Sequence, residues 1–91
     1  MNATNSVEEI KERVRKTVTE LTEIDQEKLL KDDDDLFFYG MSSRASVALM
    51  LGLESEFDIE FPESMLHRDN FKSIDCISEC IVEVITNSPQ L

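Results

Sequence analysis

The chain has 91 residues, of which 41% are hydrophobic and 32% are charged, and its formal net charge is −11. A chain of this length buries only about 60% of the surface that its unfolded form exposes, which allows one modest core and disfavours an enzyme with a deep private cleft. We therefore expect a single non-enzymatic domain over residues 1–91, with frayed ends at 1–5 and 87–91.

The charge is distributed unevenly along the chain. Residues 1–31 hold seven acids and six bases, whereas residues 32–91 hold 13 acids and three bases. The acidic part should repel nucleic acid and anionic membranes and attract partners with basic surfaces, although acidity can also serve solubility alone. The polar start at Met1–Ser6, the lack of a long apolar run and the reduced pair Cys76 and Cys80 favour a cytoplasmic protein.

The first predicted element is an amphipathic helix at about 6–22. Ser6 and Glu9 have the spacing of a capping box, in which each side chain bonds the other residue's backbone N–H. Apolar residues then recur at intervals of three and four, at Val7, Ile10, Val14, Val18 and Leu21. Such spacing places them on one face of a helix.

Residues 23–41 show no helical period and predict a long loop. Its scattered apolar residues should anchor it on the bundle, and they are Ile24, Leu29, Leu30, Leu36, Phe37 and Phe38. The run Asp32–Asp35 raises the alternative of a calcium loop, but Leu36 and Ser43 stand where an EF-hand needs an oxygen ligand and a glutamate. We expect a solvated acidic turn instead, with Lys31 as its nearby base.

A second helix is predicted after Gly40, which can adopt a positive φ. Either Ser42 or Ser43 can cap this helix, because a serine hydroxyl accepts a bond from a free N–H of the first turn. Gly52 costs roughly 1 kcal/mol relative to alanine inside a helix and suggests close packing against another element. The expected inward stripe consists of Ser46, Leu49, Met50, Leu53 and Phe57.

The remaining chain predicts a short helical turn and a last helix. Phe57–Pro62 reads as extended, since the residue before a proline avoids the α region, and Glu63–Leu66 follows as a short turn. Ser73 should cap the last helix, which Asn87-Ser88-Pro89 should end. Its apolar face consists of Ile74, Ile77, Ile81, Val84 and Ile85. The predicted fold is all-α, with three main helices and one short helix.

The candidate site is the serine at the start of the second helix. A helix N-terminus offers unpaired N–H groups and a positive dipole end, so Ser43 could bear a phosphodiester. Its alternative role is that of an ordinary N-cap. Nucleophilic catalysis needs an adjacent base, and the only histidine, His67, is distant in sequence. His67, Cys76 and Cys80 match no structural zinc spacing, so we expect no metal site.

The stretch from about Leu36 to Ile85 resembles the acyl carrier protein family. The amphipathic helix before it and the isoleucine-rich last helix also fit, so the resemblance covers almost the whole chain. Members share a Gly-x-Asp-Ser-Leu signature, a helix ending in Leu-Glu-x-Glu-Phe, and an Ile-x-Ile/Phe-Pro stretch. This chain reads Gly40-Met41-Ser42-Ser43-Arg44, then Leu53-Glu54-Ser55-Glu56-Phe57, then Ile59-Glu60-Phe61-Pro62. The resemblance implies a four-helix bundle with a 4′-phosphopantetheine arm on Ser43, whose thiol carries cargo as a thioester.

The resemblance also implies partners. These are a phosphopantetheinyl transferase, a ligase that loads an acyl or aminoacyl group, and a downstream acceptor enzyme. The expected partner-facing patch consists of Met41, Arg44, Val47 and Leu51, with Glu54 and Glu56 and the further acids Asp58, Glu60 and Glu63 steering basic partners. The rival hypothesis is a helical adaptor without a prosthetic group, in which Ser43 is merely a cap.

Two departures from the family pattern concern the cargo. Ser42 replaces the signature aspartate and Arg44 the signature leucine, and Ser43–Leu53 contains no acid, with Ala45 and Ala48 at outward candidates. A fatty-acid synthase partner with basic residues would lose contacts there. The stretches Ser42–Val47, Phe61–Leu66 and Phe71–Ile74 look more like small stand-alone carriers of activated amino acids, which ligases related to seryl-tRNA synthetases load.

Overall fold

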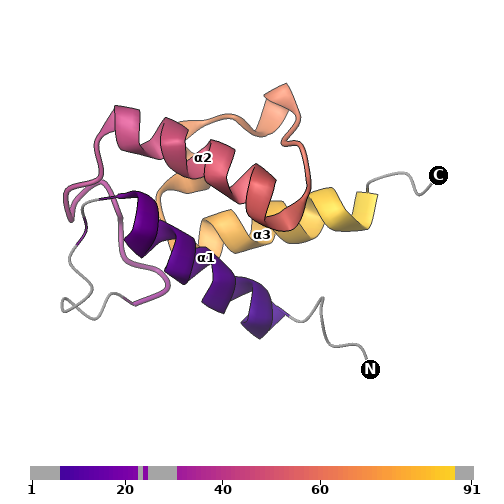
Figure 1. Cartoon of the computed structure of the whole chain (residues 1–91), viewed down its shortest axis with the longest axis horizontal. Helices are drawn as coiled ribbons and strands as arrows, with labels where there is room; N and C mark the ends of the chain where they lie inside the picture. Colours follow the sequence, from indigo (N-terminus) through magenta and orange to yellow (C-terminus); the bar gives the residue numbers. More distant parts are fainter. Residues whose placement is uncertain (1–6, 23, 25–30, 88–91) are drawn as a thin grey trace.

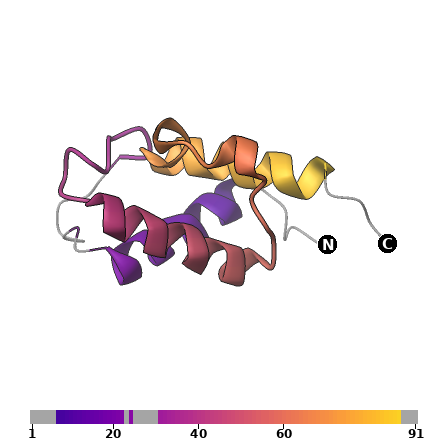
Figure 2. The same ribbon diagram turned by 90° about the horizontal axis from the view of Figure 1, so that it is seen from above.

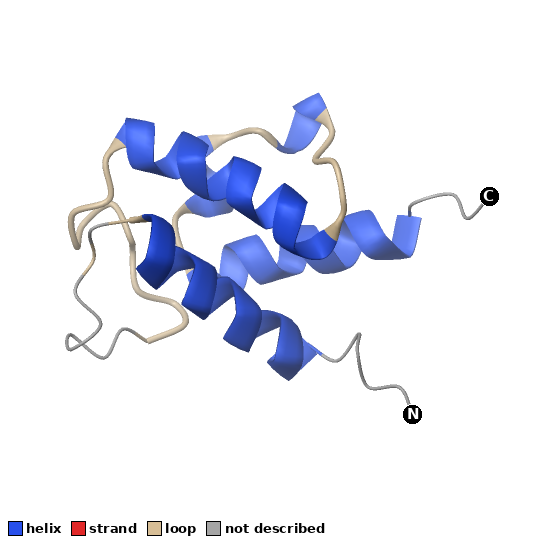
Figure 3. Cartoon of the chain, in the orientation of Figure 1, coloured by secondary structure: helices blue, strands red, loops and turns tan. Residues whose placement is uncertain are grey.

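The computed structural model describes residues 7–22, 24 and 31–87. These residues form the predicted all-α fold and include no strand (Figure 3). The helices in chain order are α1 (Val7–Leu21), α2 (Ser43–Phe57), the 3₁₀ helices η3 (Glu63–Met65) and η4 (Arg68–Phe71), and α3 (Ile74–Asn87). None of the helices in the described ranges is long and apolar enough to cross a membrane.

The predicted helix at 6–22 is confirmed as α1. Ser6 and the termini 1–5 and 88–91 lie outside the described residues, so the capping box and the fraying there stay predictions, whereas Asn87 is the last residue of α3. Two acids in the first turn, Glu8 and Glu9, face the positive end of the helix dipole. The buried face of α1 consists of Ile10, Val14, Thr17 and Val18.

α1 packs against both α2 and α3 (Figures 1 and 2). Gly52 of α2 faces Leu21 of α1, and a Cβ atom at position 52 would collide with the Leu21 side chain. The close packing that this glycine suggested is therefore confirmed. At the end of α2, Arg13 donates from Nε to the Glu56 carboxylate at 3.0 Å and from Nη2 to the Glu56 carbonyl at 2.7 Å, and its guanidinium stacks over Phe57.

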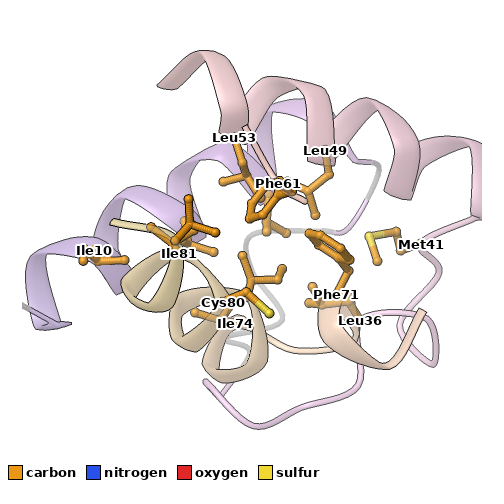
Figure 4. Close-up of a cluster of buried hydrophobic side chains, with 14 of the residues drawn as sticks. Ile10, Leu36, Met41, Leu49, Leu53, Phe61, Phe71, Ile74, Cys80 and Ile81 are labelled. Carbon is orange, nitrogen blue, oxygen red and sulfur yellow. The ribbon is translucent and has the colours of Figure 1, made fainter. Parts of the chain in front are cut away.

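The core contains side chains from the loop before α2 and from all the helices except η3. Figure 4 shows Leu49 and Leu53 of α2, Phe71 of η4 and Ile81 of α3 converging on one interior. Phe61 and Phe71 meet edge to face with ring centroids 5.3 Å apart. Ser73 accepts a hydrogen bond from the backbone N–H of Cys76 at 3.0 Å, so the predicted cap of α3 is confirmed.

The loop before α2 is held by ion pairs that the sequence did not suggest. Asp32 receives a bond from Arg15 at 2.6 Å, and Lys11 lies 3.7 Å from Asp32 and 2.9 Å from Asp75. The bond to Asp75 is the main reason why the pKa of Lys11 is raised. Our expectation that the acidic run has no nearby base apart from Lys31 is wrong, because α1 supplies Lys11 and Arg15.

The apolar residues of this loop divide into buried and exposed. Leu36 is fully buried and donates its N–H to the Lys72 carbonyl at 2.6 Å, and Ile24 is buried too. Phe38 is 81% exposed, so its predicted anchoring role is wrong. A tight turn causes the difference, because the Asp35 carbonyl accepts the N–H groups of Phe38 and Tyr39 and directs Phe38 outward. Leu29 and Leu30 lie outside the described residues.

Candidate functional site

The approach to α2 is a sharp turn at Gly40. Gly40 has φ +115°, a value that side-chain-bearing residues rarely adopt. The turn returns the chain inward, so the N–H of Met41 donates to the Leu36 carbonyl at 3.0 Å and the Met41 side chain is only 3% exposed. Met41 belongs to the core and not to a partner-facing patch, and our assignment of it to that patch is wrong (Figure 4).

Ser42 is the N-cap of α2. Its backbone is extended, and its hydroxyl oxygen accepts the N–H of Ala45 at 3.0 Å. This bond satisfies one of the donors that a helix N-terminus leaves free. The alternative that Ser43 serves merely as the cap is therefore wrong.

Ser43 is the first residue of α2, and its side chain is exposed. Its carbonyl accepts the Ser46 hydroxyl at 2.7 Å, but its own hydroxyl has no hydrogen-bond partner among the described residues. It is thus an unbonded hydroxyl at the positive end of a 15-residue helix. An exposed hydroxyl in an environment that favours negative charge fits the attachment of a phosphopantetheine through a phosphodiester.

A groove of about 310 Å³ begins at Ser43 and runs between α2 and the η3–η4 segment. Two basic residues of that segment, His67 and Arg68, line the groove together with Ser43. The rest of the lining is mainly apolar and consists of Phe37, Ser46, Val47, Met50, Leu66 and Phe71. The Arg68 guanidinium lies 3.8 Å from the centre of the Phe37 ring, which fixes it on the groove wall.

The groove brings His67 to Ser43 although 24 positions separate them in sequence. A catalytic triad would also need a group that orients the histidine. No hydrogen bond joins the His67 side chain to a carboxylate in the described part of the chain, and only its backbone groups are bonded, to Met65 and Asn70. Ser43 and His67 therefore line one groove without the third member of a triad in the described residues.

The predicted patch is exposed along α2, and its two acids make contacts within the chain. Arg44 is exposed, and Val47 and Leu51 are 52% and 55% exposed. Glu54 accepts the N–H of Phe61 at 2.9 Å, and Glu56 is bonded to Arg13. Both acids therefore hold the fold together, and their partner-binding role stays a prediction.

The other acids predicted to steer partners are exposed, namely Asp58, Glu60 and Glu63. Asp58 also ends α2 in the left-handed conformation, with φ 54°, and donates its N–H to the Glu54 carbonyl. The carboxylates of these residues remain on the outside, where they can attract a basic surface over a distance set by screening. Their steering role stays a prediction.

The two cysteines are free thiols. Cys80 is buried, and burial is the main reason why its pKa rises to about 11, with the nearby Cys76 and the acids Glu79 and Glu83 adding to the effect. A thiol with so high a pKa is a poor nucleophile at neutral pH. The described residues contain no group of three His, Cys, Asp or Glu side chains that could hold a metal ion.

Comparisons with known proteins agree with this geometry. Residues 12–81 match the family described as "Phosphopantetheine attachment site". The chain is 50% identical over 52 residues to an aminoacyl carrier protein of Agrobacterium fabrum, a match that covers 57% of this chain and 63% of that protein. It is 38% identical over 72 residues to an acyl carrier protein of Buchnera aphidicola, covering 77% of this chain and 90% of that protein.

A solved structure is similar over most of the chain. It is the crystal structure of an engineered Bradyrhizobium japonicum glycine:[carrier protein] ligase complexed with a carrier protein from Agrobacterium tumefaciens and ATP. The similarity has a TM-score of 0.75 and 37% identity, and it covers 79% of this chain and 95% of the matched chain. At this identity, the two proteins are similar in sequence as well as in the arrangement of their helices.

Proposed function

The chain belongs to the family of phosphopantetheine-bearing carrier proteins, and we propose that Ser43 is the residue that bears the prosthetic group in this member. When bound, the group supplies a thiol that holds an acyl or aminoacyl cargo as a thioester. The single observation that supports Ser43 is that the two serines at the start of α2 differ in their hydrogen bonds. Ser42 caps the helix, which leaves the Ser43 hydroxyl exposed and unbonded.

The chain's own residues present this site without catalysing a reaction. The free N–H groups and the dipole of α2 favour the negative charge of a phosphodiester at Ser43. The turn at Gly40, held by the bond from Met41 to Leu36, fixes the position of the serine relative to the core. We therefore propose a non-enzymatic carrier that depends on its partners for loading and transfer.

We propose an amino acid as the cargo. The match to an aminoacyl carrier protein and the likeness to a carrier complexed with a glycine ligase support this choice. The run Ser43–Leu53 contains no acid. Of the two alanines expected at outward positions, Ala48 is exposed, whereas Ala45 is half-buried against the core, so the expectation is wrong for Ala45. An enzyme that docks on carriers through basic residues would lose attraction there, so fatty-acid synthesis is disfavoured.

The proposed partners are a phosphopantetheinyl transferase, an aminoacyl-loading ligase and a downstream aminoacyl acceptor enzyme. The free thiols Cys76 and Cys80 support a cytoplasmic location, where thiols are kept reduced. The exposed residues Arg44, Val47 and Leu51 provide the surface that we assign to these partners.

The test is the intact mass of the chain after co-expression with a broad-range phosphopantetheinyl transferase. The wild type should gain one phosphopantetheine, Ser43→Ala should gain none, and Ser42→Ala should still be modified. If the Ser43→Ala chain is modified, or if a folded Ser42→Ala chain is not, our proposal has chosen the wrong hydroxyl.

A second assay tests the cargo. The modified chain is incubated with ATP, glycine and the glycine:[carrier protein] ligase of Bradyrhizobium, and separately with fatty-acid synthase enzymes. We expect a hydroxylamine-labile glycyl adduct on the modified wild type and poor chain elongation. Efficient elongation without aminoacylation would overturn the aminoacyl assignment.

A further inference from the structure

The bases of the acidic part of the chain gather around Ser43. From residue 32 onward the chain holds 13 acids, and its only cationic or titratable basic residues are Arg44, His67, Arg68 and Lys72. Arg44 is the chain neighbour of Ser43, and His67 and Arg68 line the groove that begins there. Three of these four residues thus neighbour Ser43 in the chain or share the groove that it lines.

Arg68 is held in place by an aromatic contact instead of an ion pair. Its guanidinium stacks on Phe37 at 3.8 Å, and no carboxylate forms a salt bridge with it within the described residues. Stacking on a ring leaves the N–H groups at the edge of the guanidinium plane free to bond an anion. Arg68 therefore presents unused donors on the wall of a groove that starts at Ser43.

Arg44 occupies a position that is unfavourable in the unmodified chain. It lies in the first turn of α2, where the helix dipole favours negative charge and disfavours a cation. The first turns of α1 and α3 carry acids, Glu8 with Glu9 and Asp75, whereas that of α2 has none. An anion attached at position 43 would attract the Arg44 side chain and so make its position favourable.

We infer that Arg68, together with Arg44, forms an anion site for the phosphodiester that links the prosthetic arm to Ser43. This inference rests on the proposed function. The phosphate is bonded directly to the Ser43 oxygen, so it lies at the entrance of the groove where Arg68 is fixed. The guanidinium of Arg68 donates to the phosphate oxygens, and Arg44 neutralises the charge from the helix side.

The same site has a consequence for the cargo. An aminoacyl thioester carries an α-ammonium group, which the positive charge of Arg68 repels from the groove. The groove therefore favours the phosphate end of the arm and leaves the aminoacyl end in solvent. A carrier of this kind presents its cargo instead of sequestering it.

The experiment is a cycle of thermal unfolding on four chains, each measured before and after modification. The chains are the wild type, Arg68→Gln, Arg44→Gln and the matched control Lys72→Gln, which removes a cation from an exposed side chain that does not line the groove. At low salt, modification should raise the melting temperature of the wild type and the control by about 2–5 °C more than that of Arg68→Gln.

Two further readouts separate a phosphate contact from a general effect of charge. The ³¹P resonance of the modified wild type should be broader than that of Arg68→Gln, because the contact restrains the phosphate. Arg44→Gln should raise the melting temperature before modification and reduce the gain after it. Salt at 0.5 M should remove the differences, since the Debye length falls to about 4 Å.

The inference is overturned if all four chains gain equally on modification, or if Lys72→Gln loses as much as Arg68→Gln. Equal ³¹P line widths in the wild type and Arg68→Gln would also overturn it. A wild type whose mass shows no modification at Ser43 would overturn the proposed function and this inference together. Normal modification with equal responses would overturn the inference alone.

Discussion

Ser42 caps α2, whereas the hydroxyl of the adjacent Ser43 is unbonded in the described residues, and one pair of substitutions should distinguish the two serines. Ser42→Ala removes the oxygen that accepts the Ala45 N–H at 3.0 Å, and no other described group replaces this acceptor. An N-cap serine contributes about 1 kcal/mol to stability. For a domain of this size, 1 kcal/mol corresponds to about 4–8 °C in melting temperature.

Ser43→Ala should behave differently. The Ser43 hydroxyl is exposed and bonds nothing in the described residues, and alanine is the better helix former. We expect a change within about 0.5 kcal/mol in either direction. Ser42→Asp should keep most of the stability that Ser42→Ala loses, because a carboxylate also accepts the N–H and faces the positive end of the dipole.

The assay is thermal unfolding of the unmodified chains by circular dichroism, with urea titration to give free energies of unfolding. The reasoning fails if Ser43→Ala loses as much stability as Ser42→Ala. It also fails if Ser42→Ala unfolds at the wild-type temperature, since the cap would then contribute nothing.

Two further predictions concern buried side chains. Met41→Ala should lower the free energy of unfolding by about 2–5 kcal/mol in a urea titration. Val47→Ala, on the exposed face, should change this free energy by less than about 0.5 kcal/mol. Similar losses in the two variants would contradict the burial of Met41. The raised pKa of Cys80, about 11, means that the folded state disfavours the thiolate. Stability should therefore be complete below pH 9 and fall as the pH rises through 11, and Cys80→Val should weaken this loss. Lys11, whose pKa is also raised, adds a loss of the same sign above pH 10.5 in both chains, so their difference isolates the thiol. At pH 8, iodoacetamide should label Cys76 faster than Cys80, and equal rates would contradict the burial argument.

The helices could be predicted from sequence because their signals are local. The apolar period of three and four residues gave α1 and α3 to within a residue or two, and Ser73 was recognised as a cap from its place before an apolar run. The resemblance, which extends over many short motifs, also predicted Ser43 as the site serine, and that assignment stays a prediction. These features depend on residues that are close together along the chain.

The errors arose where a single dihedral angle or a distant contact decides the result. The positive φ of Gly40 turns Met41 into the core, and no periodicity records such a turn. The pairing of Asp32 with Arg15 joins residues 17 positions apart, and Arg68 reaches the groove only because η4 folds back onto Phe37. Long-range pairing of this kind has no marker in the sequence.

The contact of the first helix with the last has a consequence for synthesis on the ribosome. The buried face of α1 has its partners in α2 and α3, and Lys11 meets Asp75 only after most of the chain has been made. A short helix has little stability in water without tertiary contacts, so α1 should not form a stable helix while the rest of the domain is translated. Folding should therefore wait until α3 has left the ribosome, and chains truncated before α3 should present exposed apolar residues to chaperones and proteases.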